Sequence, residues 1–164
     1  MARKYITTTP LDLLVLSPGP GQPKDFNLHE TIRIAETRAI PVFGVCLGLQ
    51  GLVEYFGGSL KQLEHPIHGK QDRVYSNQKG LFKGMPESFT VGRYHSLRAD
   101  QVPSVLKVTA TTKDDVVMAI QHVDLPMAAV QFHPESILSQ EGKMGQQLIF
   151  NVLSTLIEKI GFIN

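Results

Sequence analysis

Residues 41–50 have the sequence PVFGVCLGLQ, and this stretch decides the fold. Its first half, residues 41–45, is a short and nearly uninterrupted apolar run, which is typical of a parallel strand buried on both faces. After Cys46, apolar residues recur at the spacing of one helical face from Leu49 to Phe56. The sequence therefore predicts a strand that enters Cys46 and a helix that leaves it.

The pentapeptide Gly44–Gly48 has the pattern G-x-nucleophile-x-G between that strand and that helix. This is the pattern of a nucleophile elbow, in which a sharp turn projects the nucleophile out of the sheet and small residues let neighbouring elements approach. The partial positive charge of the helix N-terminus would also favour the thiolate of Cys46. A lone cysteine is, however, often a small apolar core residue. The pentapeptide by itself leaves a catalytic role and a packing role open.

The elements on either side of the elbow extend this pattern. Before it come an apolar run at residues 11–16, a loop at residues 17–23 and an amphipathic helix. Asn27 would cap this helix, with Glu30 as the capping-box carboxylate. Strand-leaning runs occupy much of the second half, at residues 59–63, 73–75, 89–91, 105–111, 116–121 and 128–132.

A last amphipathic helix follows Gly142, with a wide apolar stripe that ends at Ile160. The alternation of strands and helices favours an α/β domain with an open, mostly parallel sheet flanked by helices and with additional antiparallel strands. No linker divides the chain, so we expect a single domain over residues 1–164.

The composition excludes several classes of function. The chain has 164 residues, a net charge of +1 and 42% hydrophobic residues, which excludes intrinsic disorder and gives no basic excess for phosphate-driven nucleic-acid binding. Its apolar runs are shorter than the ~18 residues that a membrane span needs, and its first residues lack the apolar region of a secretory signal. The single cysteine suits a reducing compartment. We therefore expect a cytoplasmic protein with neither nucleic acid nor membrane among its partners.

His133 is the best-placed base for a Cys46 nucleophile. It follows the predicted strand at residues 128–132, and catalytic groups of open α/β sheets gather at the carboxyl ends of strands. Glu135, two residues further on, would accept a hydrogen bond from the imidazole and orient it. His-Pro-Glu alone is a weak signal that favours a loop histidine beside a solvated carboxylate. Together with the elbow, it favours a catalytic triad.

The loop at residues 17–21, SPGPG, is the third element of the site. Its glycines would bring bare backbone N–H groups against a ligand, although a stiff proline turn is the alternative. A phosphate loop is excluded because no Gly-Lys-Ser/Thr follows, and the dinucleotide pattern G-x-G-x-x-G is absent. The better functional interpretation is half of an oxyanion hole, with the N–H of Leu47 as the other half.

Three further segments carry weaker signals. Gln50 is a polar residue on the first turn after Cys46, and residues 93–97 would line a pocket or form an ordinary loop after a strand. Residues 65–68, HPIH, hold two histidines without nearby ligands for a metal, so we interpret them as a surface loop.

These motifs together resemble the class I glutamine amidotransferases, a family with a Cys-His-Glu triad. The resemblance rests on SPGPG at residues 17–21, GVCLGLQ at 44–50 and QFHPES at 131–136, in the family's order, and it covers nearly all of the chain from Leu11 onward. The segment VGRYHSL at residues 91–97 is similar to the chorismate-using branch.

That branch holds the glutaminase components of anthranilate synthase and of aminodeoxychorismate synthase. Leu49, where many relatives have histidine, and residues 41–43 most resemble the glutaminase part of fused bacterial anthranilate synthases.

The resemblance implies a role for each matching position. Cys46 would attack the carboxamide of glutamine, His133 would transfer the proton, and Glu135 would orient His133. Gly19 and Leu47 would hold the oxyanion through their N–H groups. The positions that match glutamine-binding residues are Gly19, Pro20, Gly21, Gln50, Ser96 and Leu97.

The resemblance also implies a partner and the absence of a cofactor. Ammonia would pass to a chorismate-using synthase, either a subunit or a fused domain, for anthranilate and hence tryptophan synthesis. Neither a metal nor an organic cofactor is expected in this domain, and magnesium is expected only in the synthase partner.

One departure from the family concerns the start of the chain. Family members begin with a strand, a helix and a second strand before the segment that matches residues 11–21, whereas residues 1–10 here look unrelated. We therefore expect an N-terminally truncated version of the family fold. This keeps open an inactive remnant that only binds the synthase, beside the folate-pathway alternative of aminodeoxychorismate synthesis. A cysteine peptidase would share the elbow but would give no reason for the SPGPG loop.

Overall fold

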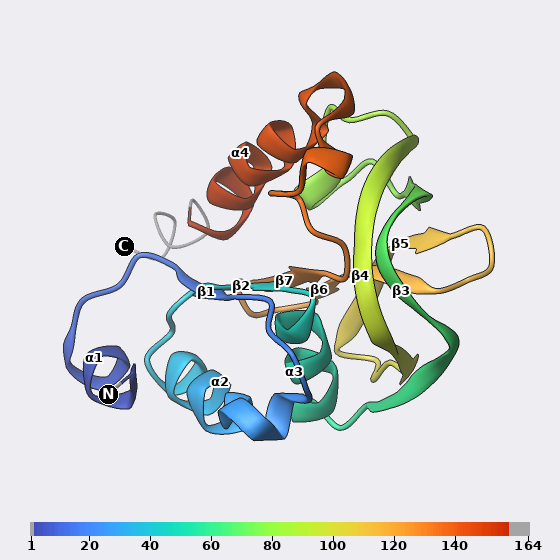
Figure 1. Cartoon of the computed structure of the whole chain (residues 1–164). Helices are drawn as coiled ribbons and strands as arrows, with labels where there is room; N and C mark the ends of the chain where they lie inside the picture. The colour runs from blue at the N-terminus through green and yellow to red at the C-terminus, as the bar shows by residue number, and fades with distance from the viewer. Residues whose placement is uncertain (1, 158–164) are drawn as a thin grey trace.

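Three short parallel strands form one side of the sheet (Figure 1). The structure is a computed structural model, and it describes residues 2–157. Strand β1 (Leu14–Leu16) pairs with β2 (Val42–Val45), and β2 pairs with β7 (Met127–Val130). We call these three strands the parallel half. Because they run in the same direction, their carboxyl ends meet at one edge of the sheet.

Four longer strands continue the sheet with antiparallel pairing. They are β3 (Ser59–Ser76), β4 (Ser88–Gln101), β5 (Leu106–Thr112) and β6 (Val117–His122), and the order across the sheet is β1-β2-β7-β6-β5-β3-β4. We call the long pair β3 and β4 the ribbon. The predicted α/β class is confirmed, but the expectation of a mostly parallel sheet is wrong, because antiparallel pairings outnumber parallel ones within residues 2–157 and the sheet is mixed. Short connections such as the turn between β5 and β6 can only join antiparallel neighbours.

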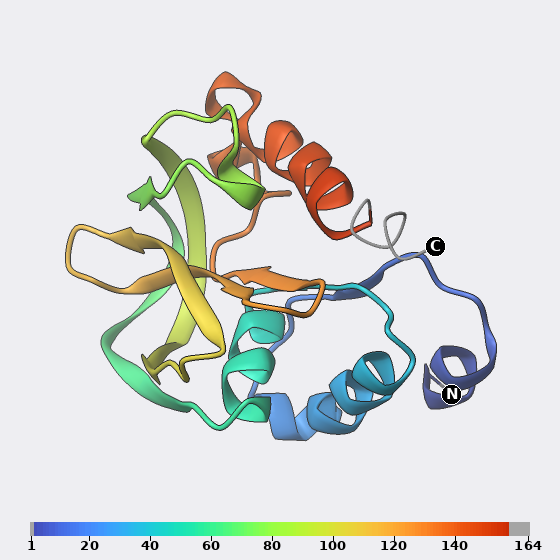
Figure 2. The ribbon, with the colours of Figure 1, turned by 180° about the vertical axis from the view of Figure 1, so that it is seen from behind.

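Helices cover both faces of the parallel half. Helices α2 (Leu28–Thr37) and α3 (Leu47–Tyr55) lie on one face, and α4 (Met144–Leu156) lies on the other, as the two opposite views show (Figures 1 and 2). The N-terminal helix α1 (Ala2–Thr8) packs against α2 and buries Ile6. The 3₁₀ turns are η1 (Pro23–Phe26), η2 (Gly80–Phe82), η3 (Ile137–Ser139) and η4 (Glu141–Lys143).

Alternating side chains of β2 divide the apolar core into two clusters. Val42 packs in the cluster that includes Ile32 of α2 and Leu52 of α3. Phe43 packs in the cluster that includes Leu148 of α4. Since strand side chains alternate between faces, a continuous apolar run is what a strand covered on both sides requires. The interpretation of residues 41–45 as a buried strand is therefore confirmed.

Three local predictions need correction. Asn27 does precede α2, but its backbone is left-handed (φ 55°) and its side chain makes no capping hydrogen bond within the described chain. Glu30 instead pairs with Arg33, with 2.8 Å between its Oε2 and the Nε of the guanidinium. The capping box belongs to the preceding turn η1, between Gln22 and Asp25.

The other two corrections concern element length and burial. The runs at 59–63 and 73–75 belong to one strand, β3, and residues 93–97 lie inside β4 rather than in a loop. The apolar stripe of α4 is narrower than predicted, because Ile149 and Leu153 are 43% and 45% exposed. Ile160 lies outside the described residues.

The segment before β1 contains a helix that the sequence interpretation had left without structure. Within residues 2–13 the structure has α1 and irregular backbone, and no strand. Arg38 holds this segment by donating hydrogen bonds from Nη1 to the carbonyl oxygens of Ile6 and, at 3.0 Å, of Thr9. Strand β1 lies at one edge of the sheet, where Val15 is 52% exposed.

Candidate active site

Cys46 lies at a sharp turn between β2 and α3. Its backbone angles are φ 54° and ψ −96°, an uncommon conformation for a residue other than glycine. Two glycines let the turn pack closely. A Cβ at Gly44 would lie 2.6 Å from the carbonyl carbon of Gly48, and a Cβ at Gly48 would lie 2.6 Å from the carbonyl oxygen of Leu16. The predicted nucleophile elbow is therefore confirmed in its geometry.

The thiol of Cys46 is buried and hydrogen-bonded. Its Sγ–H donates to the carbonyl oxygen of Tyr94 at 3.7 Å, and Nε2 of Gln131 donates to Sγ at 3.4 Å. Burial raises the pKa of the thiol to about 11, and the charge of Glu135 acts in the same direction. The N–H of Leu47 and the amide of Gln131 lower the pKa, but by less. The N-terminus of α3 does act in the expected direction, through the N–H of Leu47, but burial outweighs it and the thiol keeps its proton.

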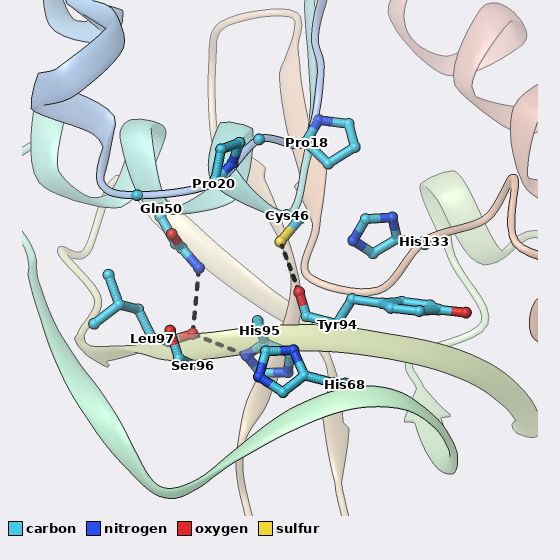
Figure 3. A pocket seen from close by; sticks show the side chains of 12 residues that line it. Pro18, Pro20, Cys46, Gln50, His68, Tyr94, His95, Ser96, Leu97 and His133 are labelled. Atoms are coloured by element: carbon cyan, nitrogen blue, oxygen red, sulfur yellow. Dashed lines mark hydrogen bonds between the residues drawn. The ribbon is translucent and has the colours of Figure 1, made fainter.

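A thiol with a raised pKa needs a base, and His133 faces the same space. Nδ1 of His133 lies 2.7 Å from Oε1 of Glu135, so the carboxylate fixes the tautomer with hydrogen on Nδ1. Nε2 is buried and makes no hydrogen bond within the described part of the chain. The ring packs edge-on against Tyr94, with 4.9 Å between the ring centroids. The free lone pair of a neutral imidazole therefore points toward the cavity that Cys46 lines (Figure 3).

A single cavity of about 520 Å³ brings together segments that are far apart in the sequence (Figure 3). It lies where the carboxyl ends of the parallel half meet the ribbon, and its volume suits a small-molecule ligand. Its lining residues are Pro18, Gly19, Pro20, Gly21, Cys46, Gln50, His68, Tyr94, His95, Ser96, Leu97 and His133.

Two predicted residues lie beside the cavity rather than in its lining. The side chain of Leu47 is buried behind the loop, and a Cβ at Gly19 would lie 3.4 Å from its Cδ2. The carboxylate of Glu135 lies behind His133, with its side chain 57% exposed. All other site residues predicted from the sequence line the cavity.

The loop at residues 17–21 is fixed by a carboxylate from η1. Oδ2 of Asp25 accepts a hydrogen bond from the backbone N–H of Gln22 at 2.8 Å. Gly21 has a φ of 86°, and a Cβ there would lie 2.5 Å from the same oxygen. Only glycine fits this position without strain, so the loop can bend over the end of β1 and α3.

The opposite wall of the cavity is held by a chain of buried polar groups from the ribbon. The carbonyl oxygen of Leu97 accepts hydrogen bonds from Nδ1 of His95 at 2.8 Å and from Nε2 of Gln50 at 3.2 Å. Nε of Arg93 donates to Nε2 of His95 at 3.0 Å, and Nη1 of Arg93 pairs with Asp72 at 2.6 Å. Because the guanidinium can only donate, His95 is neutral with hydrogen on Nδ1. Burial is the main cause that lowers the pKa of His95 to about 4.

The structure adds functional residues that the sequence interpretation missed. His68 was interpreted as part of a surface loop, but it lies in β3 opposite Tyr94 of β4 and lines the cavity. Gln131 is fully buried between Cys46 and Gln50, with Nε2 of Gln50 3.4 Å from its Oε1. Side chains alternate between the two faces of a strand, so the sequence could have placed Tyr94 and Ser96 on the same face of β4. Nothing in the sequence indicates that β3, which carries His68, pairs with β4 at this point.

Two further searches bear on the class of site. Among the described residues, no group of His, Cys, Asp or Glu side chains gathers to hold a metal ion. Every helix within residues 2–157 falls short of the length and apolar character that crossing a bilayer requires.

Comparisons with known proteins fit this geometry. The family model described as glutamine amidotransferase class-I matches residues 2–155. An anthranilate synthase from Azospirillum brasilense is 55% identical over 157 residues, which cover 94% of this chain and 21% of that protein. Anthranilate synthase component 2 from Methanocaldococcus jannaschii is 41% identical over 150 residues, covering 88% of this chain and 75% of that protein.

A solved structure shows the same fold in a more distant protein. A glutamine amidotransferase from Thermotoga maritima has a TM-score of 0.78 to this chain at 18% identity, with 92% of this chain and 81% of that chain covered. The present chain thus spans about a fifth of the Azospirillum relative but most of the two shorter proteins.

Proposed function

This chain belongs to the class I glutamine amidotransferases, and from that premise we propose that it hydrolyses L-glutamine to glutamate and ammonia through a thioester on Cys46. One observation carries the proposal: the buried thiol at the elbow lines the same cavity as His133, whose Nε2 has no hydrogen-bond partner among residues 2–157. We further propose that residues 1–164 act as a single amidotransferase domain.

The first half of the reaction forms the thioester. In the structure the S–H group donates to the carbonyl of Tyr94, so the reaction begins with rotation of S–H toward Nε2 of His133. As the proton moves to Nε2, the sulfur bonds to the carboxamide carbon and the carbonyl electron pair moves to oxygen. The C–N bond then breaks, and His133 gives its proton to the departing nitrogen, which leaves as ammonia.

The second half regenerates the thiol. Water gives a proton to His133 while its oxygen bonds to the thioester carbon, and the C–S bond breaks to release glutamate. The sulfur then takes the proton back from His133. Glu135 holds the Nδ1–H of the ring through both halves and stabilises the imidazolium that each half forms.

The backbone of two segments supplies the donors for the oxyanion. The N–H of Leu47 starts α3 directly after Cys46, and the N–H of Gly19 belongs to the loop that packs on Leu47. Backbone donors of this kind stabilise developing negative charge, and the loss of one typically costs about 3 kcal/mol of barrier. These donors therefore stabilise the negatively charged tetrahedral state more than they stabilise the bound, uncharged amide.

The remaining lining residues account for glutamine recognition. Gln50, Ser96 and Leu97 form the wall opposite the loop at residues 19–21, and the backbone of both walls offers hydrogen-bond groups to the α-amino and α-carboxylate ends of the substrate. The network behind Leu97 keeps this wall rigid.

The relatives support a partner that uses the ammonia. Two of the three similar proteins named above are an anthranilate synthase and an anthranilate synthase component 2, which favours a chorismate-using synthase subunit or fused domain and a role in tryptophan biosynthesis. Aminodeoxychorismate synthesis is the alternative within the same branch. Reconstitution with each type of synthase subunit separates them, because only the true partner will convert chorismate to its aminated product with glutamine as the nitrogen source.

The decisive test measures glutamate release from glutamine by the folded chain, alone and with the synthase subunit. We expect release that depends on Cys46, so Cys46→Ala should abolish it. Release that is equal for both proteins would contradict the proposal. Binding to the synthase without any release would instead support the non-catalytic remnant.

A further inference from the structure

Gln131 is a buried amide at the centre of the site. It follows β7 directly and is fully buried, and its backbone N–H donates to the carbonyl oxygen of Met118 at 2.9 Å. Its side chain lies between two groups of the cavity wall. Nε2 donates to Sγ of Cys46 at 3.4 Å, and Oε1 accepts from Nε2 of Gln50 at 3.4 Å.

The neighbours of Gln131 determine which end of its amide faces the sulfur. Nε2 of Gln50 donates to the carbonyl oxygen of Leu97, so the NH₂ end of Gln50 faces that carbonyl and Gln131 together. Gln131 must therefore offer its oxygen to Gln50 and its N–H to Cys46. The reverse orientation would place two N–H groups against each other in a buried space, at a high cost.

We propose that Gln131 is a positioning residue that holds the sulfur of Cys46 in its ionised form and links it to Gln50 in the glutamine-binding wall. The inference rests on the proposed function, because it assigns a role within the same reaction. It follows from the two partners of the sulfur. The carbonyl of Tyr94 accepts from S–H and repels S⁻, whereas the N–H of Gln131 binds S⁻ more strongly than S–H. Transfer of the proton to His133 therefore weakens the first contact and strengthens the second.

Other charged or titratable groups near the sulfur do not replace this donor. His133 after β7, His95 of β4 and His68 of β3 line the same cavity as the sulfur, and Glu135 lies behind His133. The charge of Glu135 raises the pKa of Cys46, whereas the hydrogen bonds from Gln131 and from the N–H of Leu47 lower it. Among the described residues, Gln131 is the side chain that donates a hydrogen bond to the sulfur, and removing it leaves the backbone N–H of Leu47 as the remaining donor.

Alkylation of Cys46 by iodoacetamide tests the role without using glutamine. Gln131→Met keeps the volume of the side chain and removes the donor, while Gln131→Glu keeps the shape and replaces the donor with an acceptor. For Gln131→Met we expect the rate constant to fall about tenfold throughout pH 7–9, which is the effect of one pKa unit on the thiolate fraction. For Gln131→Glu the rate constant should fall further. In the glutaminase assay, kcat should decrease more than KM increases.

A third variant tests the link to the binding wall. Gln50→Met removes the outer hydrogen bond and leaves Gln131 in place, so the alkylation rate constant should fall by a smaller factor, about threefold. An unchanged rate constant in Gln50→Met would overturn the link. This variant also keeps the proposal testable if the two substitutions at Gln131 prevent folding.

A matched control separates this role from ordinary packing. Asn151 is also a buried amide, but it donates to the carbonyl oxygens of Leu81 and Lys83, outside the cavity. Asn151→Leu should lower Tm and leave the alkylation profile unchanged. A wild-type profile in Gln131→Met, or an equal slowing in Asn151→Leu, would overturn the inference. Failure of the proposed function would give a different result. The unsubstituted protein would then release no glutamate, while substitution of Gln131 would still slow the alkylation of Cys46.

Discussion

The parallel half and the ribbon contribute to one cavity in different ways. In the proposed reaction the parallel half supplies the reacting groups, Cys46 after β2 and His133 after β7. The ribbon supplies a wall in which Leu97 uses its backbone carbonyl and is held by His95 and Arg93. Chemistry is therefore concentrated at strand ends, whereas recognition is built along the length of two strands.

This difference teaches that the two regions tolerate change unequally. A reacting group has a single position, which depends on tight backbone turns and on one hydrogen-bonded partner. The wall has several supports in series, from Asp72 to Gln50, so the loss of an outer support should leave the others in place. Substitutions in the parallel half should reduce kcat, and substitutions in the ribbon should mainly raise KM.

Replacing His133 should have the largest effect of all. His133→Ala removes the proton acceptor for a thiol whose pKa is about 11, so kcat should fall by roughly 10⁴-fold or more. Steady-state release of glutamate measures it. His65→Ala provides the control, because His65 is an exposed histidine of the ribbon that does not line the cavity. Comparable losses in the two variants would contradict the assignment.

The next largest effect should come from adding a methyl group at Gly48 in the elbow. Gly48→Ala places a methyl group 2.6 Å from the carbonyl oxygen of Leu16, so β1 or α3 must shift. We expect about a hundredfold loss of kcat and a decrease of about 2–3 kcal/mol in the free energy of unfolding. Urea unfolding and the glutaminase assay measure both. Gly84→Ala is the comparison, since a Cβ there meets nothing within 4 Å and adds only the strain of a φ of 75°; its kcat should be unchanged.

The parallel half could be predicted from the sequence because its signals are local. Gly44, Gly48 and the SPGPG loop mark positions where backbone must approach backbone, and a run without polar residues marks a strand covered on both faces. His133 could be placed at a strand end for the same reason. The pairing of Cys46 with His133 followed from the rule that parallel strands end at one edge.

The ribbon could not be predicted because its structure depends on pairing between distant segments. Residues 59–76 form one strand, yet Pro66, Gly69 and many charged residues gave the sequence the appearance of a loop between two short strands. The register shifts between Gln62 and Ile67, and no local pattern reports such irregularities. Gln131 was missed for a related reason. A buried amide is recognised only by its partners, and those lie 81 and 85 positions away.

Acidification should lower the free energy of unfolding over a predictable pH range, because His95 supports the cavity wall that the ribbon forms. The folded state keeps His95 neutral down to about pH 4, whereas the unfolded chain binds a proton near pH 6.5. The unfolded state therefore holds more protons between these values, and the free energy of unfolding should fall as pH decreases from 6.5 to 4, by on the order of 3 kcal/mol. Above pH 6.5 this contribution is complete.

Urea unfolding between pH 4.5 and 7.5 measures the slope. His95→Gln retains one donor and one acceptor without a titrating proton, so its slope should be shallower. It should not vanish, because burial also lowers the pKa of His122, which acts in the same direction. An unchanged slope in His95→Gln would show that His95 is accessible to protons in the folded state.

The smallest expected effect lies at the outer end of the supporting chain. Asp72 is 39% exposed at its side chain and pairs with the buried Arg93 at 2.6 Å. Asp72→Asn keeps an acceptor for Arg93 but removes the charge, and a partly exposed pair contributes at most about 1 kcal/mol. KM for glutamine should therefore rise about two- to threefold while kcat stays constant. Asp100→Asn is the matched control, because Asp100 pairs with Lys61 on the same ribbon with similar exposure (38%) but takes no part in the hydrogen bonds that link Asp72, Arg93 and His95 to Leu97. If both variants raised KM equally, the network behind Leu97 would have no special role; if Asp72→Asn reduced kcat instead, the ribbon would act on the chemical step and the division between the two regions would fail.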